Sequence, residues 1–229
     1  MPCGPAIEKG KQVEKMKRAA LLLCIPVVAL LLAPHRIEAE PRPAVIVAFG
    51  DSLTAGLGLP QDQAFPAQLE AALKARGHNV TVVNAGVSGD TASVALARLD
   101  WALPDDASAV IVELGGNDAL QGIPPEGTKK ALTAIIETLQ ARGLPVLLAG
   151  MEAPRNMGND YVEEFRAIYT DLAAQYDVVF YPFFLEGAAL TDGMMQGDGI
   201  HPSAKGVAAI VEGILPKVEE LLARVKATD

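Results

Sequence analysis

Ser52 is the residue best placed to act as a nucleophile. It follows the continuously apolar run Ala44–Phe49, and Gly50 lets the chain turn sharply between them. Reactive groups of parallel sheets collect at the carboxyl ends of the strands, so the Ser52 hydroxyl is expected to face that crevice. The nucleophile-elbow pattern Gly-x-Ser-x-Gly occurs nowhere in the chain, and a serine after a strand is by itself also ordinary turn chemistry.

A serine hydroxyl needs a base to remove its proton, and only two histidines lie beyond residue 39. His201 ends the string Asp198-Gly199-Ile200-His201, which places a carboxylate three residues before the imidazole. A tight turn there can bring Asp198 to one ring nitrogen and leave the other for Ser52, as a triad acid does. Asp198 could equally be a turn residue. His78 lies between a predicted helix and strand at the opposite end of the sheet, where a solvated loop residue is expected.

Acyl transfer also needs hydrogen-bond donors where negative charge develops on the carbonyl oxygen. Gly89 can offer a backbone N–H with no side chain in the way, and Asn117, after Gly115-Gly116, can offer a side-chain amide. Each of the two is unremarkable as a turn residue when taken alone. Asp90 and Asp118 are expected to form turn or cap hydrogen bonds, with no role in the reaction.

Apolar runs alternate with amphipathic stretches from residue 44 onward, which predicts βαβ units and a parallel sheet covered on both faces. No internal repeat or Pro/Gly/Ser-rich linker interrupts this part, so residues 40–229 are predicted to form one domain. Strands are expected at Ala44–Phe49, Val80–Val83, Ala109–Leu114, Pro145–Ala149 and Val178–Tyr181. Helices are expected at Phe65–Arg76, Thr91–Leu103, Pro125–Ala141, Asn159–Gln175 and Ser203–Val225.

Composition excludes several classes of protein. Of the 229 residues, 50% are hydrophobic and 21% charged, which is too apolar for a disordered chain. Beyond Ala39 the chain has 13 basic and 25 acidic side chains, and that acidic balance argues against a nucleic-acid partner. Both cysteines, Cys3 and Cys24, precede residue 40, so the body has no disulfide, no thiol nucleophile and no cysteine-ligated zinc.

The first 39 residues have the pattern of a secretory signal peptide. Five Lys or Arg between Lys9 and Arg18 precede the uncharged run Ala19–Ala33, and the small residue Ala39 is the expected cleavage site. Met16 would be a more usual start. The run is short for a membrane span, and Pro26 interrupts it, although an uncleaved anchor is the alternative. The body is therefore predicted to be periplasmic or secreted, with no stable membrane span after cleavage.

Four blocks, in order, resemble those of the SGNH, or GDSL, hydrolase family. They are Gly50-Asp51-Ser52-Leu53, Gly89, Gly115-Gly116-Asn117-Asp118 and Asp198-Gly199-Ile200-His201. The longer strings around them are similar to the branch that contains arylesterases and acyl-CoA thioesterase I–lysophospholipase L1-like enzymes. The resemblance implies a flavodoxin-like three-layer α/β/α sandwich with a five-stranded parallel sheet. It also implies Ser52 as nucleophile, His201 as base, Asp198 as its partner, and an oxyanion hole from Ser52, Gly89 and Asn117.

The chemistry expected is hydrolysis of acyl esters or thioesters through an acyl-enzyme, with no metal or organic cofactor. Met157, Phe184 and Met195 are expected in loops near the crevice, where they could line an acyl pocket; ordinary packing is the alternative. Two other functions stay open. One is a carbohydrate acetylesterase, and the other is a non-catalytic envelope binding protein on the same fold.

Overall fold

The computed structural model describes Met1 and residues 42–225. Residues 42–225 belong to one compact unit. The predicted signal peptide, its cleavage site at Ala39 and both cysteines lie outside the described residues. Among the described helices, none is both long and apolar enough to cross a membrane.

A five-stranded sheet forms the middle layer, and all of its strand pairs are parallel. Its order is β2-β1-β3-β4-β5, with β1 at Ala44–Gly50, β2 at Val80–Gly86, β3 at Ala107–Glu113, β4 at Val146–Ala149 and β5 at Val179–Tyr181. The central strands are buried because helices cover both faces, which explains their continuously apolar sequences. The predicted fold class is confirmed.

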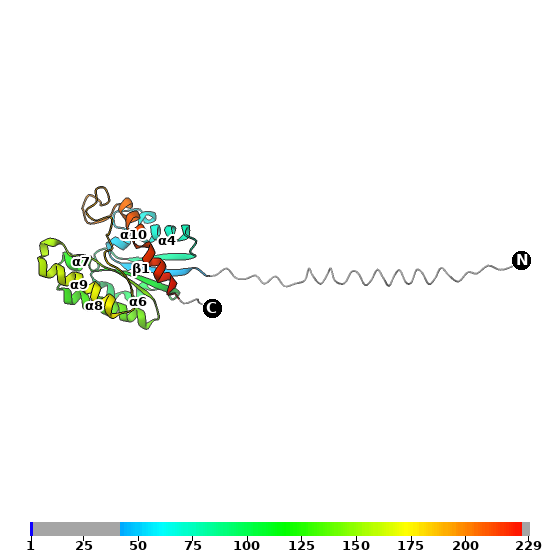
Figure 1. The fold of residues 1–229 in the computed structure, drawn as a ribbon, viewed down its shortest axis with the longest axis horizontal. Coiled ribbons are helices and arrows are strands. Elements are labelled where there is room, and N and C mark those ends of the chain that lie inside the picture. Colours follow the sequence, from blue (N-terminus) through cyan, green and yellow to red (C-terminus); the bar gives the residue numbers. More distant parts are fainter. Residues whose placement is uncertain (2–41, 226–229) are drawn as a thin grey trace. The chain divides into compact units, whose positions relative to one another are not determined.

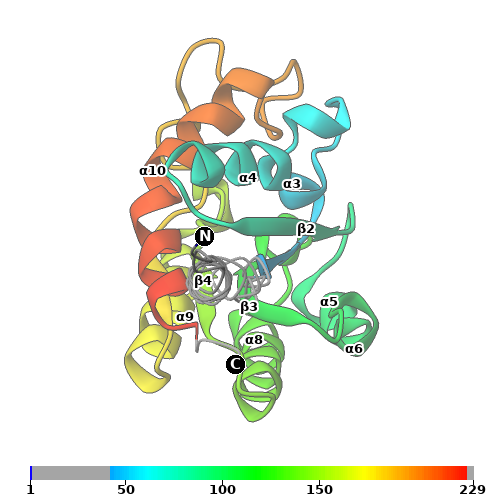
Figure 2. The same cartoon turned by 90° about the vertical axis from the view of Figure 1, so that its right-hand side faces the viewer.

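Helices form the two outer layers (Figures 1 and 2). On one face α4 (Phe65–Ala75) packs against α10 (Ala204–Ala223) and over β2, while α10 also contacts β4 and β5. On the other face α8 (Pro125–Ala141) packs between α5 (Ala92–Ala97) and α9 (Asn159–Gln175). The buried side chains of α8 recur every three or four residues, so one stripe of the helix meets the sheet.

The predicted helix Thr91–Leu103 is in fact two short helices. Thr91 caps α5 through its hydroxyl, α5 ends at Ala97, and α6 (Leu99–Ala102) begins after Arg98. The side chain of Arg98, at this break, contacts Asp90 and the end of β1. These are tertiary contacts, and the spacing of apolar residues in a helix does not predict them.

Several other boundaries also differ from the prediction. Strand β2 continues three residues past Val83, which places Asn84 inside the strand, and β3 begins two residues before Ala109. The short helices α3 (Ser52–Ala55) and α7 (Gly116–Leu120) and the 3₁₀ turns at Gln61–Gln63 and Arg155–Met157 were not predicted. They are too short to produce a periodic pattern.

Candidate active site

Ser52 begins α3 directly after β1, at the carboxyl edge of the sheet. Asp51 caps this helix, because its Oδ1 accepts a hydrogen bond from the Leu53 N–H at 2.9 Å. Gly50 is required by close packing, since a Cβ there would collide with the Thr54 hydroxyl and lie 2.7 Å from the Glu113 carbonyl oxygen. The turn therefore presents a Ser52 side chain that is mostly buried.

His201 is brought to Ser52 from 149 positions away. The distance from Ser52 Oγ to His201 Nε2 is 2.9 Å, and His201 Nδ1 lies 2.7 Å from Asp198 Oδ2. Because Nδ1 faces the carboxylate, we assign it the proton, which leaves Nε2 to accept from the Ser52 hydroxyl. The three residues form a connected nucleophile, base and acid.

The loop around His201 is held by its own hydrogen bonds. Asp198 Oδ1 accepts from the backbone N–H of Ile200 at 2.9 Å and of His201 at 3.0 Å. The side-chain bond to His201, followed by these backbone bonds, holds the pKa of Asp198 well below its usual value, so it is ionised. Gln196 ties the loop to the serine side, because its Nε2 donates to the carbonyl of Leu57 at 2.8 Å. Gln196 was not predicted, and no sequence signal marks it.

Gly89 and Asn117 come to the same edge of the sheet. Gly89 has a φ of 90°, a left-handed conformation that glycine tolerates best, and its N–H has no hydrogen-bond acceptor within residues 42–225. Asn117 Nδ2 donates to Asp51 Oδ2 at 3.0 Å and to the carbonyl of Asp90 at 2.9 Å. Its amide is thus fixed by two acceptors and would share those hydrogens with any third one.

Two buried carboxyl groups lie beneath the nucleophile. Burial raises the pKa of Asp51 to about 6, against the lowering effect of the Leu53 N–H. Glu113, at the end of β3, is fully buried, and burial followed by the nearby Asp51 raises its pKa well above the usual value. Glu113 Oε2 accepts from the Thr54 hydroxyl at 2.7 Å, while Oε1 has no partner in the described part of the chain.

Sequence reasoning missed the role of Glu113, although a signal was present. A glutamate at the end of Val110-Ile111-Val112 is the one ionisable residue of a strand predicted to be buried on both faces. A charge is costly there, so burial raises the pKa of this carboxyl next to the turn that carries Ser52.

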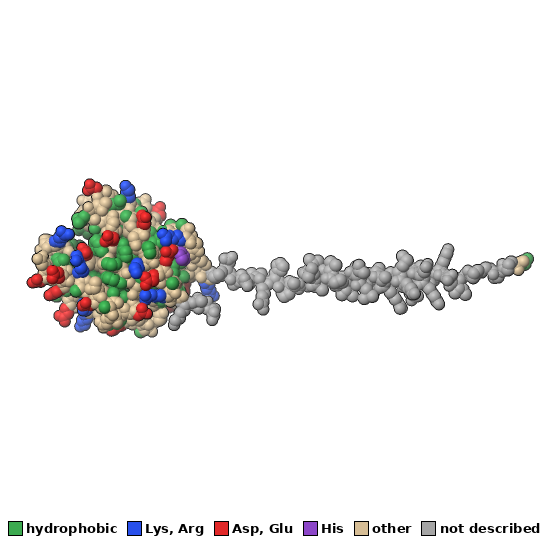
Figure 3. All heavy atoms as spheres, in the orientation of Figure 1, with side chains coloured by type: hydrophobic (Ala, Val, Ile, Leu, Met, Phe, Trp, Pro, Cys, Tyr) green, Lys and Arg blue, Asp and Glu red, His purple; other side chains and the backbone are tan. Residues whose placement is uncertain are grey.

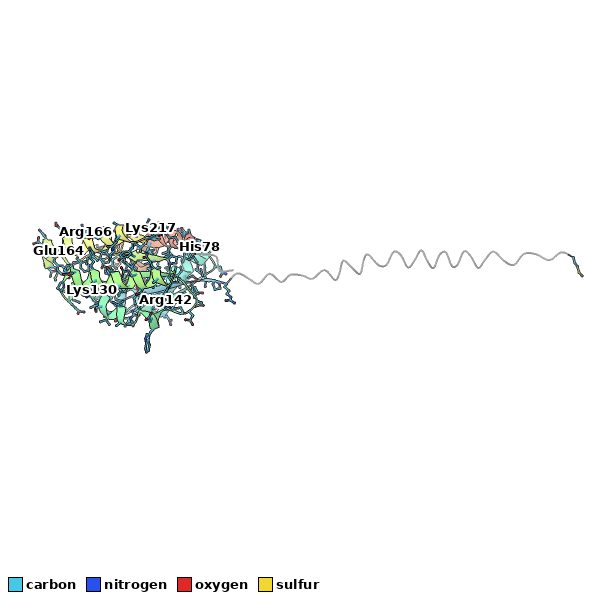
Figure 4. All side chains as sticks on the ribbon, turned by 90° about the horizontal axis from the view of Figure 1, so that it is seen from below. His78, Lys130, Arg142, Glu164, Arg166 and Lys217 are labelled. Carbon is cyan, nitrogen blue, oxygen red and sulfur yellow. The ribbon has the colours of Figure 1, made fainter. Side chains whose placement is uncertain are left out.

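Asp118 makes the cap bond expected of it, whereas the side chain of Asp90 forms an ion pair in place of the expected turn or cap bond. Asp118 Oδ2 accepts from the Ala92 N–H at the start of α5, and its Oδ1 accepts from the Thr128 hydroxyl. Asp90 is paired with Arg98. His78 is on the surface (Figure 4), where its Nε2 lies 3.1 Å from Glu219 Oε1, far from the carboxyl edge of the sheet.

The predicted acyl-pocket residues do not share one environment. Phe184 is fully buried and packs edge-to-face on Phe65, with ring centroids 5.0 Å apart. It belongs to the core, so the expectation that it lines a pocket is wrong in this structure. Met157 and Met195 are half-buried. The Met157 methyl group lies near Gly122, two residues after α7, and Met195 forms a backbone bridge with Pro202, the residue after His201.

The sequence matches the GDSL-like Lipase/Acylhydrolase family over residues 48–209, which include Ser52, Asn117 and His201. The chain belongs to this family. It is similar to Esterase TesA of Pseudomonas aeruginosa, with 39% identity over 202 residues covering 88% of this chain and 98% of that protein. It is also similar to Thioesterase 1/protease 1/lysophospholipase L1 of Escherichia coli K12, with 36% identity over 199 residues, 86% of this chain and 93% of that one.

Solved structures agree with this assignment. The structure of AlinE4, described as an SGNH-hydrolase family esterase, is 44% identical and covers 80% of this chain and 99% of its own, with a TM-score of 0.68. As a member of the GDSL-like Lipase/Acylhydrolase family, the present chain is a serine hydrolase.

Proposed function

We propose that Ser52, His201 and Asp198 hydrolyse carboxylic esters and thioesters of apolar acyl groups. The observation that carries this proposal is the 2.9 Å contact between Ser52 Oγ and His201 Nε2, with Nδ1 held by Asp198. The contact supports direct proton transfer, because it already has hydrogen-bond length.

The reaction would run in two halves. Ser52 Oγ attacks the carbonyl carbon while His201 Nε2 takes its proton, and the imidazolium then gives that proton to the leaving alcohol or thiol as the bond to it breaks. Water attacks the acyl-enzyme, His201 takes a proton from it, and that proton returns to Ser52 as the acid leaves.

The oxyanion would be stabilised by three donors. They are the N–H of Ser52, the N–H of Gly89 and Nδ2 of Asn117. As the first residue of α3, Ser52 has an N–H for which the helix has no internal acceptor. Such donors act most strongly where they are held in place before the reaction. The hydrogen bonds from Asn117 Nδ2 to Asp51 and Asp90 hold this amide in one orientation.

Exposed apolar side chains flank these residues along the chain and suit an apolar acyl group. They are Leu57, Val87, Leu120 and Ile200, each between 44% and 54% exposed. Val87 is two residues before Gly89, Leu120 is three after Asn117, and Ile200 precedes His201. Met157 and Met195 would extend this surface, since both are half-buried and flexible.

The distribution of charge and the predicted signal peptide bear on the class of substrate and on the location of the enzyme. Lys and Arg are interspersed with Asp and Glu on the face shown in Figure 3, in keeping with a small-molecule substrate and with no nucleic-acid role. The predicted signal peptide at residues 1–39 supports a periplasmic or secreted enzyme, and residues 40–229 would be its hydrolase domain.

Labelling with a fluorophosphonate, together with Ser52→Ala, tests the proposal. The wild-type protein should be labelled at one serine and hydrolyse p-nitrophenyl acetate; Ser52→Ala should keep its fold and lose both properties, with a fall in kcat of at least about 10⁴-fold. Ser93→Ala, on the exposed side of α5, is the matched control and should behave like wild type.

Activity of Ser52→Ala near the wild-type level would remove Ser52 from the mechanism, and an unlabelled wild-type protein would favour a binding protein. Assays on acyl-CoA thioesters and on acetylated sugars, run in parallel, separate the proposed substrates from those of a carbohydrate acetylesterase.

A further inference from the structure

Arg98 is a half-buried cation at the junction of α5 and α6, outside every motif of the family resemblance. Its side chain is 23% exposed and makes three contacts at once. Nε donates to Asp90 Oδ2 at 2.5 Å, Nη2 donates to the carbonyl of Gly50 at 3.0 Å, and the guanidinium carbon lies 4.6 Å from the centre of the Phe49 ring.

These contacts join the chain segments that carry the proposed oxyanion donors. Gly50 is two residues before Ser52, and Asp90 directly follows Gly89. The carbonyl of Asp90 accepts one hydrogen of the Asn117 amide at 2.9 Å. One guanidinium thus connects the Ser52 turn, the Gly89 turn and, through Asp90, the Asn117 side chain.

The Gly89 turn depends on this connection for its position. At its start, the Val87 N–H donates to the carbonyl of Gly50 at 3.1 Å, and the Asp90 N–H closes the turn on the Val87 carbonyl at 3.2 Å. At its end, the Asp90 carboxylate is 7% exposed and is held by Arg98. Charge-assisted hydrogen bonds of this kind are stronger than neutral ones. Because the pair is partly buried, dissolved salt screens it only weakly.

We propose that Arg98 is a positioning residue for the oxyanion hole, because it sets the distance between the Ser52 turn and the Gly89 turn. This inference rests on the proposed function of the site. Arg98 acts through Gly50 and Asp90 and does not itself meet the substrate. Its planar fork reaches two acceptors in fixed directions while stacking on Phe49, which the single point charge of a lysine cannot reproduce.

Kinetics of Arg98→Gln and Arg98→Lys, with p-nitrophenyl acetate, test the proposal. We expect Arg98→Gln to lower kcat by about 10²-fold, the effect of a lost oxyanion donor, with KM changed only a few-fold. Arg98→Lys should lose less. The pH at which kcat/KM is half-maximal should not move, because the bonds between Asp198, His201 and Ser52 are untouched. Arg142→Gln is the matched control, since Arg142 lies on the surface after α8 (Figure 4) and its side chain pairs with the exposed Asp100.

Two measurements separate positioning from a merely structural role. Guanidinium chloride, at concentrations too low to unfold the protein, should partly restore kcat in Arg98→Ala and leave Arg142→Ala unchanged. The loss in Arg98→Gln combined with Asn117→Ala should be smaller than the product of the two single losses, because both act on the same hole. If the Arg98 variants unfold, Asp90→Asn weakens the same ion pair and should lower kcat by about 10-fold.

The proposal is overturned if folded Arg98→Gln keeps the wild-type kcat, if its only change is a lower melting temperature, or if its effect multiplies with that of Asn117→Ala. Such results would leave the proposed function standing, provided that Ser52→Ala is inactive. A wild-type protein that neither hydrolyses esters nor reacts with a fluorophosphonate would instead contradict the proposed function.

Discussion

Replacing Asp51 by asparagine should stabilise the protein at neutral pH and destabilise it at acidic pH. Replacing a carboxylate that is stabilised by a salt bridge would have the opposite effect. The pKa of Asp51 is raised from 3.8 to about 6, mainly by burial. Between these values the folded protein holds a proton that the unfolded chain has lost, so the contribution of Asp51 to stability falls as the pH rises. A shift of about two pKa units corresponds to about 3 kcal/mol of destabilisation. This cost of ionising the buried carboxyl is fully present above pH 6 and absent below pH 4.

Asparagine removes this cost and introduces a smaller one. It keeps the size of the side chain and an oxygen for the Leu53 N–H, but it gives up the acceptor for Asn117, at about 1 kcal/mol. We therefore expect Asp51→Asn to be less stable than wild type by about 1 kcal/mol near pH 4 and more stable by about 2 kcal/mol near pH 7.

Urea unfolding at pH 4, 5, 6 and 7, followed by circular dichroism, measures the difference between the two proteins. Asp62→Asn, in an exposed 3₁₀ turn, is a control for loss of a surface carboxylate and should change stability little. A difference between Asp51→Asn and wild type that is the same at all four pH values would refute the argument, because it would show that Asp51 binds protons equally in the folded and unfolded states, so that folding does not raise its pKa.

Two further predictions concern the oxyanion hole and the core. Asn117→Ala should lower kcat for p-nitrophenyl acetate by about 10²–10³-fold with little change in KM, and a change confined to KM would make Asn117 a binding residue. Phe184→Ala should cost about 3–5 kcal/mol in urea unfolding, because it removes a fully buried ring from Phe65, and should leave the chain-length preference among p-nitrophenyl esters unchanged. A stable variant with a new chain-length preference would show instead that Phe184 lines the acyl pocket.

The long elements of this fold could be predicted from local pattern. Helices α8 and α9 have the predicted bounds, because a 17-residue amphipathic helix repeats its apolar spacing several times. Strand β1 was predicted because six successive apolar residues, Ala44–Phe49, are typical of a strand that is buried on both faces. Helices α3 and α7 complete only about one turn each, so their sequences contain no period to detect.

The candidate site residues were predicted from residue type and spacing, whereas the topology of the sheet brings them close together in space. Ser52, Asp198 and His201 were picked because few residues of the body can act as nucleophile or base, and the four family blocks strengthened the choice. The sheet order places the end of β1 next to the ends of β2 and β3, and the loop before α10 completes the site.

The sequence by itself therefore determined the fold class, the family and the set of reactive side chains, because periodicity and short motifs are local properties. The tertiary structure alone decided what surrounds those side chains. Burial of Glu113 and Asp51, the three contacts of Arg98 and the core position of Phe184 each depend on residues distant in the chain. Desolvation and packing are set by neighbours in space, and no local pattern specifies them.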